Sequence, residues 1–248
     1  MGLPAALPVS GPPVTLGEGN TPVVRLRNGP DRAGANAAMA RAVEQPGRYP
    51  LTSYSSPSPG GNPPPSSQPR SSRGDPHANE GYKPVAYELA RDFSRRQLDM
   101  VVVPTSRADL LAGIGRGFRE LAAAGLIGRE PRLVAAETAA AAPFTAALRH
   151  PDRADQERTR VTGGPTVAFS LGEERPCRQG LDALWRGRGT AVAVDDEAIM
   201  AGHRRPAAGL LLEPSSAVAS AVVRAQARTS GGLVVAIGTA TGLKGLVG

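Results

Sequence analysis

Residues 98–118 have the sequence LDMVVVPTSRADLLAGIGRGF, in which a short polar turn joins an apolar run to a helical pattern. The run at residues 100–103 is too short and too β-branched for a helix, and we expect a central strand of a parallel sheet. Apolar side chains then recur at helical spacing and predict one buried face, formed by Leu111, Ile114, Phe118 and Leu121. The 105–109 turn between them is expected to present backbone N–H groups at a helix N-terminus, beyond the carboxyl end of a strand. Sheets of α/β proteins bind phosphate at such places.

Strands and helices alternate along the chain from residue 80 onward. Further strands are expected at residues 132–136, 190–194, 210–212 and 233–237. Helices are expected around residues 86–93, 143–149, 181–185 and 195–201, and after an N-cap at Ser215. The charged segment 150–166 is predicted to be a surface loop. This order predicts an α/β fold, a three-layer open parallel sheet flanked by helices with right-handed crossovers.

The chain before residue 77 differs in composition from the rest. Residues 1–14 are rich in proline and predict a flexible arm, while residues 15–55 carry a short strand signal and a short Ala-rich helix signal. In segment 56–76, 16 of 21 residues are Pro, Gly or Ser, so it cannot bury enough apolar surface to offset its ordering entropy. We expect a disordered linker there, followed by the α/β domain at residues 77–248.

Composition excludes several classes of function. The net charge of +7 comes from scattered arginines without a basic block or an RNA-binding motif, so no nucleic-acid partner is expected. The single cysteine, Cys177, fits a structural thiol in a reducing compartment. The histidines His77, His150 and His203 are too far apart in sequence to indicate a metal site. With no membrane-spanning run and no signal peptide, we expect a cytoplasmic protein without a membrane partner.

Five short motifs carry a resemblance to a known family. They lie at residues 16–22, 80–83, 103–109, 213–217 and 239–244. In this order they resemble threonine synthase and the related fold type II pyridoxal-phosphate enzymes. The resemblance implies the large domain of that fold, with residues 15–55 as an N-terminal remnant of the family fold and most of the smaller domain missing after Asn28. It also implies pyridoxal 5'-phosphate as cofactor, β- or γ-replacement or lyase chemistry on amino acids, and a homodimer.

The same resemblance implies which residues meet the cofactor. Its phosphate group would lie at the 105–109 turn, Thr239 would hydrogen-bond the pyridine nitrogen, and Glu213 would lie near the ring. The implied cofactor-binding residues are therefore Ser106, Arg107, Ala108, Asp109, Glu213 and Thr239. Each position also has a structural alternative. Residues 106–109 could form a plain turn between a strand and a helix, Thr239 could simply end a strand, and Glu213 could be an acid at the start of a helix. Asp109 and the absence of glycine from the turn depart from the family pattern.

The chain contains two lysines, Lys83 and Lys244, and neither lies in the motif whose lysine binds the cofactor covalently in the family. Both are expected on the solvated surface, and no catalytic residue is assigned. Three hypotheses follow: an inactive or truncated paralogue that binds the cofactor weakly and non-covalently, a non-catalytic module that holds a phosphate-bearing small molecule or a partner, and an enzyme that uses Lys83.

Overall fold

The computed structural model describes residues 79–203, 211–226 and 232–242. The arm, the N-terminal segment and the linker expected before residue 77 lie outside these residues. The elements follow in the order α3 (Lys83–Asp92), β1 (Leu98–Pro104), α4 (Asp109–Ala123), β2 (Arg132–Thr138), α5 (Pro143–Ala147), α6 (Arg153–Arg158), η2 (Phe169–Leu171), α7 (Arg178–Arg186), β3 (Thr190–Val194), α8 (Asp196–His203), α9 (Pro214–Gln226) and β4 (Leu233–Ala236). Among the described helices, none combines the length and the apolar composition that a membrane span requires.

The four strands form one parallel sheet in the order β3-β2-β1-β4. Strand β1 is central: its Val102 lies opposite Val134 of β2 on one side and Ala236 of β4 on the other. Six of its seven residues are buried, as a strand covered on both faces requires. The parallel sheet and the central position of the apolar run are confirmed.

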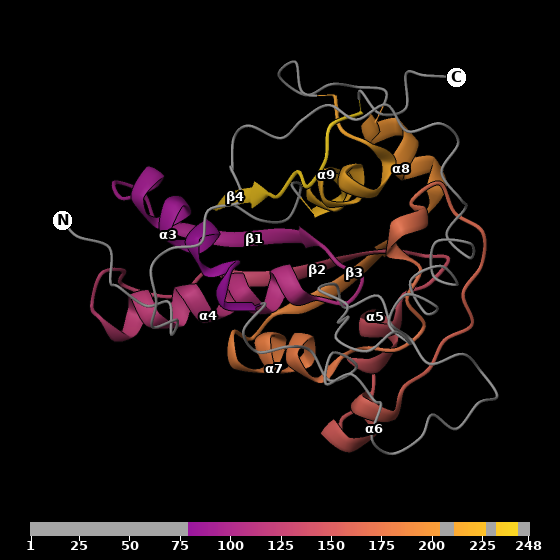
Figure 1. Ribbon diagram of the computed structural model, residues 1–248, viewed down its shortest axis with the longest axis horizontal. Coiled ribbons are helices and arrows are strands. Elements are labelled where there is room, and N and C mark those ends of the chain that lie inside the picture. The colour runs from indigo at the N-terminus through magenta and orange to yellow at the C-terminus, as the bar shows by residue number, and fades with distance from the viewer. Residues whose placement is uncertain (1–78, 204–210, 227–231, 243–248) are drawn as a thin grey trace, which may run out of the picture. The chain divides into compact units, whose positions relative to one another are not determined.

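The side chains of the sheet alternate between two hydrophobic cores. Val101 and Val103 of β1, with Leu133 and Ala135 of β2, face α3, α4, α5 and α7. The intervening residues of both strands face α8 and α9. Figure 1 shows the resulting three layers, with α8 and α9 on one side of the sheet and α4 and α7 on the other.

Two expectations about loops and caps were wrong. A short helix, α6, interrupts the segment expected to be irregular, because Asp152 accepts hydrogen bonds from the backbone N–H groups of Ala154 and Asp155 at 2.8 and 3.2 Å. Helix α9 begins at Pro214, so Ser215 lies inside the first turn instead of capping it. The Ser215 hydroxyl is buried and has no hydrogen-bond partner among the described residues.

The strand expected at residues 210–212 is reduced, in its described part, to an isolated bridge. Leu212 pairs antiparallel with Thr241, which follows β4, and Gly242 donates its backbone N–H to the carbonyl of Leu211 at 2.8 Å. The segment before α9 is thereby joined to the segment after β4.

The carboxyl ends of β1 and β4 lie side by side at the C-terminal end of the parallel sheet, and this end is the edge referred to from here on. From β1 the chain continues through α4 to β2, whereas β4 arrives on the other side of β1 after α9. The connections therefore diverge between these two strands, with α4 on one face and α9 on the other. Open α/β sheets bind ligands at such a switch point, outside the carboxyl ends of the strands.

Candidate functional site

The 105–109 turn lies at this edge and is anchored to the neighbouring strand. Thr105 donates its backbone N–H to the carbonyl of Ala136 at 2.8 Å and its hydroxyl to the carbonyl of Val103 at 2.8 Å. Ala108 takes up the left-handed conformation, with φ 63° and ψ 19°, directly before α4. Among the described residues, the backbone N–H groups of Ser106 and Ala108 have no acceptor. The turn therefore offers donors at the positive end of a 15-residue helix, which suits an anion.

The carboxylate of Asp109 is held by α7. Gln179 donates its side-chain amide to Asp109, and Asn79 donates to the amide oxygen of Gln179 at 2.6 Å. Asn79 is fully buried, and this chain of polar contacts joins the segment before α3, helix α7 and the start of α4. The negative charge that departs from the family pattern is thus engaged by hydrogen bonds within the protein.

Helix α7 supports the turn from behind. A Cβ atom added to Gly180 would lie 2.5 Å from the Cβ of Ala108, so only glycine permits this approach. The thiol of Cys177 donates to the carbonyl of Arg107 at 2.7 Å and accepts from the backbone N–H of Gly180. Burial raises the pKa of Cys177 to about 12, which is consistent with a structural thiol.

Arg107 extends from the turn toward Glu173. Its guanidinium group lies 3.7 Å from the Glu173 carboxylate, and both side chains are largely buried. Arg107 thus places one positive charge close to the turn, and Glu173 places one negative charge beside it.

Glu213 and Thr239 lie together on the other side of the switch point. The hydroxyl groups of Thr239 and Ser216 are 2.8 Å apart, and Ala240 donates its backbone N–H to Ser216 at 2.7 Å. Glu213 donates its backbone N–H to the carbonyl of Ala240 at 3.2 Å. Thr239 as a whole is exposed at this end of the sheet.

The structure thus brings the six expected residues to one edge, in two groups. The first group follows β1 and consists of Ser106, Arg107, Ala108 and Asp109. Thr239 follows the adjacent strand β4. Ile237, the residue directly after β4, still pairs with β1, because its backbone N–H donates to the carbonyl of Val102 at 2.9 Å. The hydrogen bonds given above join each group to its own supporting helix, α7 for the first and α9 for the second. A ligand that touches both groups must span the ends of β1 and β4.

Glu137 is a residue of this edge that the sequence patterns did not reveal. It is 1% exposed at the end of β2, and its carboxylate accepts three hydrogen bonds from the start of α5. The donors are the backbone N–H of Phe144 at 2.9 Å, the backbone N–H of Thr145 at 2.7 Å and the hydroxyl of Thr145 at 2.7 Å. An acid at the end of an apolar strand, shortly before a proline-initiated helix, was the available signal.

The expectation that Lys83 is a solvated surface residue was wrong. Lys83 is 2% exposed between α3 and α4, and its ammonium group pairs with Glu80 and, at 2.8 Å, with Glu120. Burial lowers the pKa of Lys83, but the hydrogen bonds to Glu120 and Glu80 raise it by more, so the net shift is upward. Lys244 lies outside the described residues.

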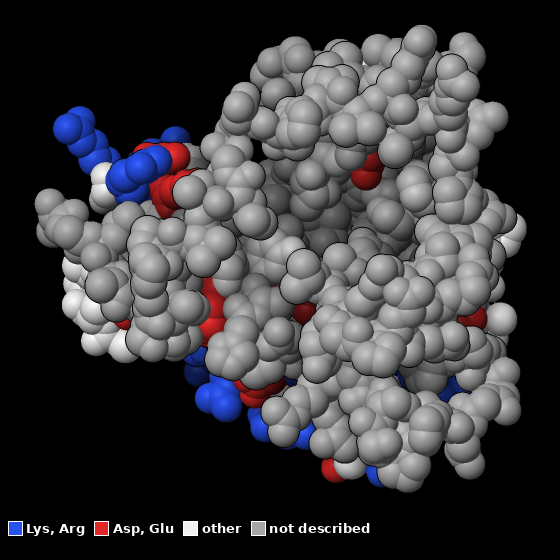
Figure 2. Space-filling model, in the orientation of Figure 1, with Lys and Arg blue, Asp and Glu red and all other residues white. Residues whose placement is uncertain are grey.

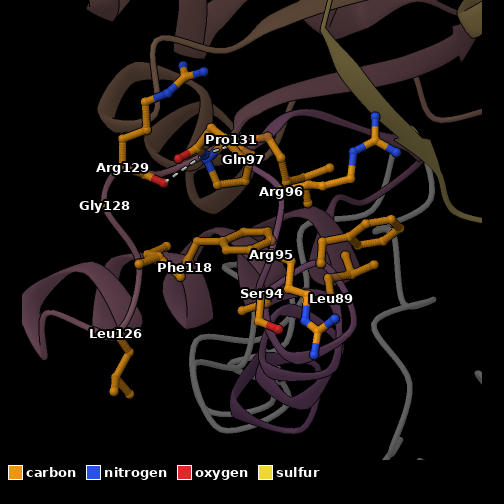
Figure 3. A pocket seen from close by; sticks show the side chains of 14 residues that line it. Leu89, Ser94, Arg95, Arg96, Gln97, Phe118, Leu126, Gly128, Arg129 and Pro131 are labelled. Carbon is orange, nitrogen blue, oxygen red and sulfur yellow. Dashed lines mark hydrogen bonds between the residues drawn. The ribbon is translucent and has the colours of Figure 1, made fainter.

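A hollow of about 300 Å³ lies at the opposite edge of the sheet, where β1 and β2 begin. Phe118 and Leu89 contribute to its apolar wall, and Arg95, Arg96 and Arg129 lie on its rim. Figure 3 shows that the three guanidinium groups point in different directions, so they do not converge on one anion. In the part of Figure 2 that shows described residues, acidic and basic side chains lie next to one another near α3.

Comparison with known proteins identifies relatives of this chain. A family model described as pyridoxal-phosphate dependent enzyme matches residues 23–240. A threonine synthase of Methanocaldococcus jannaschii is 28% identical over 147 residues, which are 58% of this chain and 36% of that protein. A threonine synthase of Methanosarcina acetivorans is 27% identical over 154 residues, covering 60% of this chain and 37% of that protein. The chain thus spans about a third of the length of these relatives.

Solved structures share the fold at low sequence identity. A fungal L-serine ammonia-lyase from Rhizomucor miehei superposes with a TM-score of 0.57 and 19% identity, over 67% of this chain and 53% of that one. The processed form of threonine deaminase isoform 2 from Solanum lycopersicum superposes with a TM-score of 0.56 and 20% identity, over 67% and 46%. The three-layer sheet therefore has the fold expected from the resemblance, that of the large domain of fold type II enzymes.

Proposed function

Because this chain belongs to the pyridoxal-phosphate-dependent enzyme family, we propose that it binds pyridoxal 5'-phosphate weakly and without a covalent bond. The phosphate group is held at the 105–109 turn by backbone N–H groups, and the ring lies toward Thr239. The main support is the conformation of this turn, in which Ala108 is left-handed. At the start of α4, the backbone N–H groups of Ser106 and Ala108 have no acceptor among the described residues.

The residues of the site fit a phosphate dianion in three respects. The start of α4 supplies positive potential, the Arg107 guanidinium lies close by, and Asp109 is engaged with Gln179. Gly180 allows α7 to pack against Ala108 and fix the turn. Affinity carried by backbone donors and a helix terminus, without a covalent bond, supports the expectation of weak binding.

The described residues would orient the ligand, and none of them would supply an amine to it. Pyridoxal phosphate, when bound, supplies an electron sink for negative charge that develops on an amino-acid substrate. The family's covalent lysine has no counterpart in its motif here, and Lys83 is buried in ion pairs with Glu80 and Glu120. Thr239 would donate its hydroxyl hydrogen bond to the ring nitrogen, and a neutral partner leaves that nitrogen less electron-withdrawing than a carboxylate does. We therefore infer an inactive paralogue that lacks much of the family's smaller domain.

A second function, a non-catalytic module for another phosphate-bearing small molecule, rests on the same turn. Such a ligand needs the donors of Ser106 and Ala108 but not the hydroxyl of Thr239. The two functions therefore differ in whether the β4 side of the edge takes part.

Thermal unfolding in the presence of three compounds tests the proposal. Pyridoxal phosphate and inorganic phosphate, at millimolar concentration, should raise the melting temperature, whereas pyridoxal, which lacks the phosphate, should not. The Thr239→Val variant should lose part of the response to pyridoxal phosphate and none of the response to inorganic phosphate. A response of this variant to pyridoxal phosphate equal to that of the unchanged chain would favour the second function, and no response of the unchanged chain to either compound would show that the 105–109 turn is structural.

A further inference from the structure

Glu137 lies next to the 105–109 turn, on the same face of the sheet. Pro104 pairs with Ala136 in the register of β1 and β2, and Thr105 donates its backbone N–H to the Ala136 carbonyl. The next residue along β2 is Glu137. Its backbone therefore lies beside that of Thr105, at the usual spacing of neighbouring strands, about 5 Å. Because side chains alternate along a strand, Glu137 shares the face of Leu133 and Ala135, which pack against α4.

A continuous series of contacts connects the Glu137 carboxylate to the turn. The carboxylate holds the backbone N–H of Phe144 at the start of α5. The Phe144 ring packs against Gly180, where an added Cβ would lie 2.7 Å from ring carbons and 2.5 Å from the Cβ of Ala108. Phe144, Gly180 and Ala108 thus meet at one point beneath the turn.

Few charged groups surround Glu137. Strand β3 and helix α5 contain no ionisable side chain, and β1 contributes only Asp99 near its opposite end. The 105–109 turn contributes Arg107, paired with Glu173, and Asp109, paired with Gln179. Helix α7 begins with Arg178, which pairs with Glu157, after the thiol of Cys177. Burial raises the pKa of Glu137 to about 7, against the lowering effect of its hydrogen bonds from Thr145 and Phe144.

We propose that Glu137 makes anion binding at the 105–109 turn proton-linked: the turn binds a phosphate dianion more tightly when the Glu137 carboxyl is protonated. This inference rests on the proposed function. It makes Glu137 a residue that sets the pH dependence of the site without touching the ligand.

Two effects of protonation oppose each other, and their sizes decide the direction. Protonation weakens the hydrogen bonds to α5, but the neutral carboxyl still offers oxygen acceptors to Phe144 and Thr145. Protonation also removes a full negative charge from a buried position beside a dianion, where little water screens the repulsion. We infer that the charge effect is the larger, and the two variants below test this order. By linkage, a ligand that raises the pKa of the carboxyl by one unit binds the protonated form about tenfold more tightly.

The test measures dissociation constants of pyridoxal phosphate at pH 6 and pH 8.5 for the full chain and two variants. Glu137→Gln keeps the shape and removes the charge, and Thr145→Val removes one hydrogen bond to Glu137 but keeps its charge. The phosphate group's own titration is the same for all three proteins, so ratios between proteins isolate the Glu137 effect.

At pH 8.5, Glu137→Gln should bind pyridoxal phosphate about three- to tenfold more tightly than the unchanged chain, and about equally at pH 6. Thr145→Val should keep the pH dependence of the unchanged chain but move its midpoint to higher pH, because the hydrogen bond that it removes lowers the pKa of Glu137. Calorimetry in two buffers near pH 7 should record proton uptake on binding that Glu137→Gln lacks. Equal ratios at both pH values, or weaker binding by Glu137→Gln at both, would overturn the linkage while leaving the proposed function intact. Absence of binding by all three proteins would remove the proposed function and the linkage together.

Discussion

The ammonium group of Lys83 lies 2.8 Å from a carboxylate oxygen of Glu120, buried between α3 and α4. Tyr87 donates its hydroxyl to the other oxygen of Glu120, and Glu80 pairs with both Lys83 and Arg116. The cluster fixes α3 against α4. The hydrogen bond that Lys83 donates to Glu80 holds the pKa of Glu80 below its usual value. Lys83 is therefore a structural cation of this interface.

Replacing Lys83 by methionine should destabilise the domain. Glu80 and Glu120 would then lose their ion pairs with Lys83 and meet an apolar side chain instead, and we expect a loss of about 2 kcal/mol in the free energy of unfolding. Urea unfolding measures it. The matched control is Arg91→Ala, which removes an exposed ion pair with Asp92 on the same helix and should change stability little. Similar losses in both variants would show that the cluster does not hold α3.

Gly180→Ala should both destabilise the chain and disturb the turn. The added methyl group would lie 2.5 Å from the Cβ of Ala108 and 2.7 Å from the Phe144 ring, so backbone or side chains must shift. Overpacking of this kind costs about 1–3 kcal/mol. Gly164→Ala is the control, because its added methyl group would meet no heavy atom closer than 3.9 Å. Urea unfolding of both variants should separate them, and equal stability would mean that α7 adjusts without cost.

Local patterns predicted the elements of the sheet well because their causes lie within a few residues. The apolar run and the helical spacing at residues 98–118 each describe a buried face of a single element, and the structure confirms β1 and α4 there. The cap of α6 at Asp152 was missed because a short, charged helix has no apolar periodicity.

The contacts that shape the site join residues far apart in the chain, so no local pattern contains them. Gln179 reaches Asp109 across 70 positions, and Lys83 reaches Glu120 across 37. The burial of Lys83 depends on the close approach of α3, which Gly117 permits, since an added Cβ there would lie 2.8 Å from the Lys83 carbonyl. Glycines four positions apart on one helix, Gly113 and Gly117, were the signal of this packing.

Stability should depend on pH through Glu137. Its pKa is about 7 in the folded chain and near 4.5 when unfolded, so the folded state binds the proton more tightly. Between these values the free energy of unfolding therefore falls as pH rises, by about 3 kcal/mol in total, and the loss is complete above pH 7. Urea unfolding from pH 5 to 8.5 should show Glu137→Gln gaining stability relative to the unchanged chain. Parallel profiles would mean that Glu137 does not titrate in this range.

Ser106→Pro should weaken phosphate binding, since proline removes one backbone N–H donor of the 105–109 turn. Ser106→Ala keeps that donor and is the matched control. Thermal shifts with inorganic phosphate should be reduced in the proline variant and retained in the alanine variant. A reduced shift in both would assign the effect to the Ser106 hydroxyl instead of the backbone.

The purified chain should neither turn over O-phosphohomoserine, threonine or serine nor form a covalent adduct with pyridoxal phosphate that borohydride fixes. An enzyme of this family needs an unprotonated amine positioned against the cofactor's aldehyde, and that amine also removes the substrate's α-proton. Lys83 is held as a cation by two carboxylates, and its pKa is raised, so at neutral pH it carries its proton and is unavailable as a nucleophile. Mass spectrometry after borohydride reduction, together with assays of product release, measures both outcomes. Turnover or an adduct that Lys83→Ala abolishes would establish the third hypothesis, that Lys83 replaces the lost lysine. An adduct that persists in Lys83→Ala would indicate Lys244 as the reacting amine.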